Sequence, residues 1–149
     1  MGVVSSQRAG RTHGYRLNTE HLAARPIAML ADLHGELISR LRRNFDEWVE
    51  PPVYAALFGS TARGDMTATS DIDLFIVHRD TAELDDFQQQ VDDLSARVTR
   101  WTGNDTRPLT YAATEVGPGD PIFTSILNQG QTLYGDRVWL TRAIRKAGS

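Results

Sequence analysis

Two aspartates alternate with branched apolar residues in the segment DIDLFIV, which begins at Asp71. Side chains two positions apart on a β-strand point to the same face and lie roughly 6.5 Å apart along it. Asp71 and Asp73 would therefore present two carboxylates together, and their charges repel unless a cation lies between them. Mg²⁺ and Mn²⁺ prefer oxygen ligands and need few protein carboxylates when substrate phosphates supply the others. The segment predicts a metal site at Asp71 and Asp73, suited to metal-assisted phosphoryl chemistry.

A candidate phosphate-binding turn precedes these aspartates. The apolar run VYAALF leads into Gly59 and Ser60, and Arg63 follows. A Gly-Ser turn after a buried strand leaves backbone N–H groups free for an anion, and glycine allows close approach. Ser60 would add a hydroxyl donor and Arg63 a forked donor to a phosphate. Alone, a Gly-Ser pair is usually an ordinary turn and an arginine such as Arg63 usually lies on the surface without a function. Their order between two apolar strands favours one combined site.

The elements that would position this site alternate between helix and strand. Apolar residues recur at three- and four-residue steps over 26–48 and 84–101, which is typical of amphipathic helices. Asp80 or Thr81 is the predicted cap of the second helix. Strands are predicted over 53–58, 71–77 and about 106–112, with Pro108 favouring an edge position for the last. Two further helices are predicted after Asp120 and within RVWLTRAIRK. The fold class is therefore α/β, a small mixed sheet flanked by helices.

Composition excludes several classes of protein. The 149 residues, of which 40% are hydrophobic and 23% charged, are typical of one globular domain with a core. A net charge of -3 provides no overall basic field for nucleic acid. The chain contains no cysteine, which excludes disulfides and thiolate metal sites. The apolar runs are too short for a membrane span and no signal-peptide pattern is present, so we expect a cytoplasmic protein.

The stretch LFGSTARGDMTATSDIDLFIV resembles the signature of the DNA polymerase beta-like nucleotidyltransferase superfamily, and most closely its minimal prokaryotic members. The resemblance runs from about Val53 to Gly135 and includes the late ILNQGQTLYG. It implies the polymerase-beta-like fold, nucleotide phosphates bound at Gly59 and Ser60, and Mg²⁺ or Mn²⁺ held by Asp71 and Asp73. The implied reaction is attack of a hydroxyl group on the α-phosphate of a nucleoside triphosphate, with release of pyrophosphate. The hydroxyl belongs to a protein, an RNA or a small molecule, and ATP is the first candidate for the triphosphate.

Catalytic members of that superfamily usually carry a third carboxylate on a neighbouring strand. Here this strand should lie in NDTRPLTYAATE, whose middle contains Arg107 and no acid. Asp105 is the first candidate for the third catalytic carboxylate and Glu115 the second, although Asp105 beside Gly103 is slightly more typical of an ordinary turn residue. An alternative to the enzyme therefore stays open: a nucleotidyltransferase-like binding module that pairs with a protein partner, as family members in toxin–antitoxin operons do.

The N-terminal residues predict a β-hairpin in which GVVSS and HGYRLN are joined by QRAGRT. The stretch resembles the wing and exit strand of an arsenical-repressor-like winged helix. This implies sequence-independent DNA contacts by Arg8 and Arg11 if an upstream winged helix exists; a solvated arm is the plain alternative. We predict a wing-like arm over 1–24 and a nucleotidyltransferase domain over 25–149. A nucleotide-sensing transcriptional regulator is a third hypothesis, and the long helix is a candidate surface for a homodimer.

Overall fold

The computed structural model describes residues 4–9, 12–17, 24–59, 62 and 71–146, with side chains from residue 32 onward. The chain divides into two compact units, residues 1–36 and 37–149. In the first unit, β1 (Val4–Ala9) and β2 (Thr12–Leu17) form an antiparallel hairpin in which Val4 pairs with Leu17. The predicted hairpin is therefore present. Its likeness to a wing stays a prediction, because Arg11 and the side chain of Arg8 lie outside the described residues.

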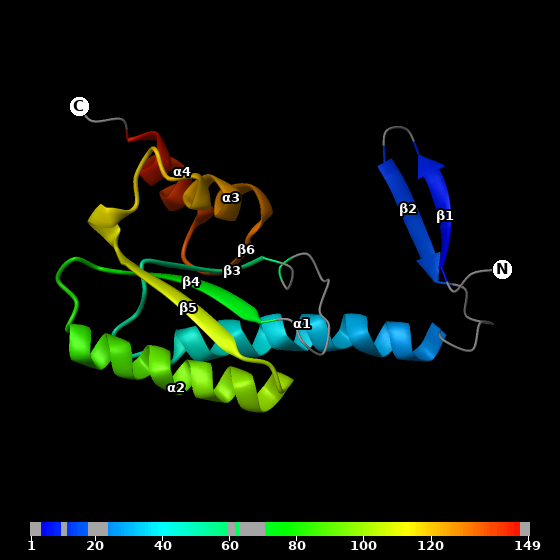
Figure 1. Ribbon diagram of the computed structural model, residues 1–149, viewed down its shortest axis with the longest axis horizontal. Helices are drawn as coiled ribbons and strands as arrows, with labels where there is room; N and C mark the ends of the chain where they lie inside the picture. Colours follow the sequence, from blue (N-terminus) through cyan, green and yellow to red (C-terminus); the bar gives the residue numbers. More distant parts are fainter. Residues whose placement is uncertain (1–3, 10–11, 18–23, 60–61, 63–70, 147–149) are drawn as a thin grey trace. The chain divides into compact units, whose positions relative to one another are not determined.

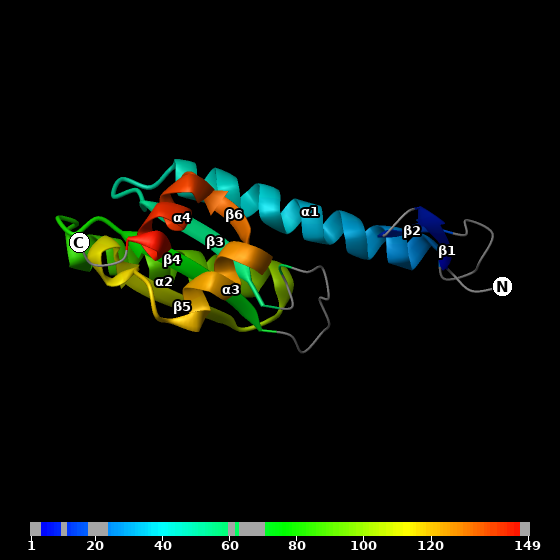
Figure 2. The same cartoon turned by 90° about the horizontal axis from the view of Figure 1, so that it is seen from above.

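The second unit is built on a four-stranded mixed sheet with the strand order β5-β4-β3-β6. Strand β3 pairs antiparallel with β4 and β6, whereas β4 and β5 are parallel. Residues 37–46 of α1 pack with α2 on one face of the sheet, and α3 and α4 cover the other (Figures 1 and 2). The predicted α/β class is confirmed. The element bounds are β3 (Tyr54–Phe58), β4 (Ile72–His78), β5 (Thr106–Ala112), β6 (Gln131–Tyr134), α1 (Ala24–Asp46), α2 (Leu84–Thr102), α3 (Pro121–Gln129) and α4 (Arg137–Arg145).

Alternation along β4 divides the core into two layers. Ile72, Leu74 and Ile76 pack into the cluster beneath α1 and α2, while Phe75 and Val77 pack into the cluster beneath α3 and α4. Since side chains two apart on a strand share a face, Asp73 lies on the α3/α4 face. Asp71, two residues earlier and directly before the strand, belongs to the same face. The alternation of side chains along the strand thus places both carboxylates on one face, at the start of β4.

Two predictions about individual residues have opposite outcomes. Pro108 lies in β5, which is an edge strand as predicted. The predicted cap of α2 is wrong, because the residue at the N-cap position is Glu83 and its side chain makes no cap hydrogen bond. The chain first makes a turn after β4, and the Asp80 carboxylate instead accepts hydrogen bonds from the backbone N–H and the hydroxyl of Thr114, at 3.1 and 2.9 Å.

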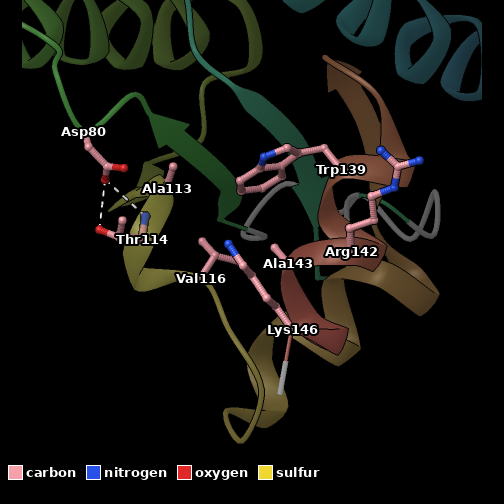
Figure 3. Close-up of a pocket in the computed structure, with 8 residues that line it drawn as sticks. All are labelled: Asp80, Ala113, Thr114, Val116, Trp139, Arg142, Ala143 and Lys146. Carbon is pink, nitrogen blue, oxygen red and sulfur yellow. Dashed lines mark hydrogen bonds between the residues drawn. The ribbon is translucent and has the colours of Figure 1, made fainter. Parts of the chain in front are cut away.

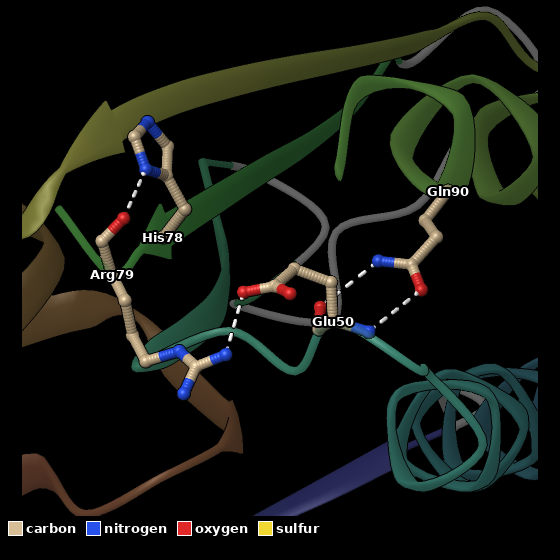
Figure 4. A network of polar contacts seen from close by, with 4 residues as sticks. All are labelled: Glu50, His78, Arg79 and Gln90. Atoms are coloured by element: carbon tan, nitrogen blue, oxygen red, sulfur yellow. Dashed lines mark hydrogen bonds and ion pairs between the residues drawn. The ribbon is translucent and has the colours of Figure 1, made fainter. Parts of the chain in front are cut away.

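A polar network holds the connection before β3 in place (Figure 4). The Arg79 guanidinium pairs with the Glu50 carboxylate at 2.7 Å. The Gln90 side chain donates to the Glu50 carbonyl at 2.9 Å and accepts from the Glu50 N–H at 3.1 Å. Nδ1 of His78 contacts the Arg79 carbonyl oxygen at 2.8 Å. These contacts link α2, the last residue of β4 and the residues after α1, at the end of β4 farthest from Asp71.

Candidate functional site

The two predicted metal ligands lie together at the start of β4. Asp73 pairs across the sheet with Phe58, the last residue of β3. Gly59 follows directly, with a φ of 73°, and a Cβ built on it would lie 2.6 Å from Oδ2 of Asp73. The absence of a side chain at Gly59 therefore makes room for the Asp73 carboxylate. This brings the predicted turn glycine and the predicted carboxylate into one site.

Arg107 completes the described part of this site. Strand β5 runs parallel to β4 with Arg107 in register with Asp73, and neighbouring strands lie about 4.8 Å apart. The Arg107 guanidinium forms an ion pair with the Asp71 carboxylate. The side chain of Arg107 is 70% exposed and that of Asp71 is 29% exposed. The strand predicted to carry a third acid thus brings a cation to the carboxylates.

The charge of Asp73 is poorly compensated. Burial raises the pKa of its carboxyl above the usual range, the Arg107 guanidinium acts in the opposite direction, and the neighbouring Asp71 raises that pKa to a smaller extent. Desolvation and like-charge repulsion both penalise the ionised form. A cation bound to both carboxylates would remove this penalty.

The candidate third carboxylates lie in different places. Asp105 directly precedes β5 and is exposed. Its backbone carbonyl accepts a hydrogen bond from the N–H of Ile72 at 2.8 Å. Glu115 lies beyond the opposite end of β5, in the short 3₁₀ turn η1 (Ala113–Glu115), and its carboxylate accepts the N–H of Ala112 at 2.7 Å. Within the described part of the chain, no group of three or more acidic or histidine residues is arranged to hold a metal ion.

The remaining nucleotide-binding candidates, Ser60 and Arg63, lie outside the described residues. The described residues nevertheless suit Mg²⁺ or Mn²⁺, because the Asp71 and Asp73 carboxylates are adjacent hard oxygen donors and the space beside Asp73 is one that a Cβ at Gly59 would fill. Arg107 was not proposed for this site from the sequence. The signal that identifies it is the parallel register between β4 and β5, which residue types alone do not reveal.

A separate cavity of about 600 Å³ lies beyond the other end of β4 (Figure 3). Asp80 and Thr114 line one side, and Trp139, Arg142 and Lys146 of the α4 region line the other. The Trp139 ring stacks on Tyr54 with centroids 6.2 Å apart. Of the predicted site residues that the structure describes, none lines this cavity. No helix in the described part of the chain is long and apolar enough to cross a membrane.

One known protein family matches part of the chain. Residues 36–102 match the family described as nucleotidyltransferase domain, a stretch that contains Gly59, Asp71 and Asp73. No curated protein matches the chain.

Several solved structures match most of the chain at low sequence identity. A toxin–antitoxin crystal structure with AMP-PNP has 18% identity and a TM-score of 0.47, over 72% of this chain and 82% of that chain. A structure of the tri-AMPylated Shewanella oneidensis HEPN toxin in complex with MNT antitoxin has 15% identity and a TM-score of 0.48, over 74% of this chain and 82% of that chain. A toxin–antitoxin MntA-HepT structure has 17% identity and a TM-score of 0.44, over 75% and 82%.

Proposed function

We propose that this protein is a metal-dependent nucleotidyltransferase, which transfers a nucleoside monophosphate from a nucleoside triphosphate to a hydroxyl of a protein, an RNA or a small molecule. The observation that carries the proposal is the pair of carboxylates, Asp71 and Asp73, on one sheet face beside Gly59, whose lack of a side chain makes room for the Asp73 carboxylate. The match of residues 36–102 to a nucleotidyltransferase domain supports it independently of that geometry.

The roles of the residues follow from their chemistry. Asp71 and Asp73 would hold Mg²⁺ or Mn²⁺, which when bound supplies charge neutralisation at the α-phosphate. Gly59 leaves room for the Asp73 carboxylate and exposes its own backbone to the phosphates, where Ser60 and Arg63 are proposed to donate hydrogen bonds. Asp105 is the proposed acceptor of the proton from the attacking hydroxyl. Most of the catalysis would be positioning and electrostatic stabilisation.

A nucleotidyltransferase-like binding module is the second candidate. It is favoured by the Arg107 guanidinium at the Asp71 carboxylate and by the exposed position of Asp105 outside β5. Such a module would bind metal and nucleotide and pair with a protein, with little or no turnover. DNA contact through Arg8 and Arg11 and a cytoplasmic location both stay proposals from the sequence.

Labelling of an acceptor tests the proposed function. The purified protein is incubated with each α-labelled nucleoside triphosphate, Mg²⁺ or Mn²⁺ and host lysate, beside Asp71→Asn and Asp73→Asn. The control is Asp86→Asn, an exposed aspartate in the first turn of α2. We expect label on protein or RNA with the wild type and the control, and none with the two site variants. Transfer that survives in Asp71→Asn would refute the proposal, and metal-nucleotide binding without transfer would favour the binding module.

A further inference from the structure

Arg107 is placed where it faces both carboxylates. It lies on the edge strand β5, in parallel register with Asp73. Residues in register on neighbouring strands direct their side chains to the same face of the sheet, so Arg107 shares its face with Asp71 and Asp73. The ion pair with the Asp71 carboxylate is the contact that results. The Arg107 guanidinium therefore occupies a carboxylate that the proposed metal needs.

The Arg107 guanidinium in this ion pair can be replaced by another cation. The Arg107 side chain is 70% exposed, and ion pairs with solvent-exposed partners are weak. A divalent cation that binds Asp71 competes with the guanidinium for the charge of that carboxylate, so Arg107 opposes the metal when the metal arrives alone.

The situation differs when the metal arrives with a triphosphate. The displaced guanidinium then lies beside phosphate oxygens that carry several negative charges, and its planar fork can donate two hydrogen bonds to one phosphate. The cost of leaving Asp71 is offset by this new contact. The same side chain thus opposes the free metal and favours the metal-nucleotide complex.

We propose that Arg107 is an exchangeable counter-ion, which holds the Asp71 carboxylate in the free protein and moves to the phosphates of a bound nucleoside triphosphate. This inference rests on the proposed function of the Asp71 and Asp73 site. Its consequence is that metal and nucleotide bind cooperatively, and that metal without nucleotide binds weakly. Arg107 is a nucleotide-binding residue in this scheme, because its guanidinium contacts the bound phosphates.

Two affinities measured on one set of variants test the inference. Free Mn²⁺ is followed by its electron paramagnetic resonance signal, first with protein alone and then with protein and a non-hydrolysable nucleoside triphosphate analogue. We expect Arg107→Ala to bind Mn²⁺ alone about two- to fivefold more tightly, because a weak competing pair is removed. It should bind the Mn²⁺-nucleotide complex about tenfold more weakly, because charge-assisted hydrogen bonds are lost.

Two further variants control for charge and fold. Arg107→Lys keeps the charge without the fork, so its affinity for Mn²⁺ alone should stay near that of the wild type while the affinity for the nucleotide complex falls partway. Arg97→Ala removes an exposed arginine of α2, which lies on the other face of the sheet, and should change neither affinity. Thermal unfolding of each variant reports whether it is folded.

The outcomes separate this inference from the proposed function. Opposite shifts of the two affinities in Arg107→Ala support the exchange. Shifts in the same direction, or no shift while Asp71→Asn abolishes binding, would overturn the inference and leave the site at Asp71 and Asp73 intact; Arg107 would then only join β5 to β4. If the wild type does not bind metal and nucleotide, or if Asp71→Asn binds them as well as the wild type does, the proposed function is refuted and the inference with it.

Discussion

Replacement of Gly59 by alanine separates a backbone effect from an effect on the site. Gly59 has a φ of 73° and Gly103, at the end of α2, has a φ of 74°. A side chain in this left-handed region costs about 1–2 kcal/mol, so Gly59→Ala and Gly103→Ala should share that cost. An alanine Cβ at position 103 would meet nothing within 4 Å, whereas at position 59 it would lie 2.6 Å from Oδ2 of Asp73.

The difference between the two variants therefore measures the contact with Asp73. Ordinary van der Waals contact begins at 3.4 Å, so the Asp73 carboxylate must retreat by roughly 0.8 Å from its 2.6 Å position. Mg²⁺ and Mn²⁺ sites tolerate little displacement of an oxygen ligand, and disturbed ligand positioning costs about 10- to 100-fold in affinity. We expect both variants to lower the Tm by about 3–8 °C, and only Gly59→Ala to lose about tenfold or more in Mn²⁺-nucleotide affinity.

A double-mutant cycle completes this test. In an Asp73→Ala background the clash is absent, so the further change Gly59→Ala should cost only the backbone term seen at Gly103. The assays are thermal unfolding by circular dichroism and Mn²⁺ titration with a nucleotide analogue. Equal losses of affinity in Gly59→Ala and Gly103→Ala would refute the idea that Gly59 makes room for the carboxylate.

Three further outcomes are expected. Because burial raises the pKa of Asp73, the folded protein binds that proton more tightly than the unfolded chain, and the contribution of Asp73 to stability falls as pH rises from the ordinary to the raised pKa. With metal chelated, Asp73→Asn should melt above the wild type at neutral pH and lose this advantage below about pH 4; coincident melts at all pH values would contradict this. Gly135→Ala should destabilise by about 1 kcal/mol more than Gly103→Ala in urea, because its Cβ would press on the Val53 carbonyl oxygen, a backbone atom that cannot easily yield. Asp80→Ala removes the acceptor of two Thr114 hydrogen bonds and should cost about 1 kcal/mol, while Mn²⁺ affinity, measured in parallel, should not change.

Local patterns in the sequence predicted much of this protein. The alternation in DIDLFIV placed Asp71 and Asp73 on one face, because strand periodicity is a property of the backbone itself. The three- and four-residue steps predicted the helices that became α1 and α2. Pro108 predicted the edge strand, because proline has no N–H to donate to a second neighbour. Each of these inferences needs only residues that are close along the chain.

The tertiary structure decided which residues from distant segments meet. Asp80, predicted as a helix cap, instead accepts hydrogen bonds from Thr114, since β4 and β5 end side by side and bring the two residues together. The same pairing places Arg107 beside Asp73 and in contact with Asp71, although all of α2 separates them in sequence. Parallel register is set by how a crossover helix packs on the sheet, and no residue near Arg107 encodes it. The sequence alone thus predicted that the two carboxylates lie together, and packing of the whole domain determined that their neighbour is a cation.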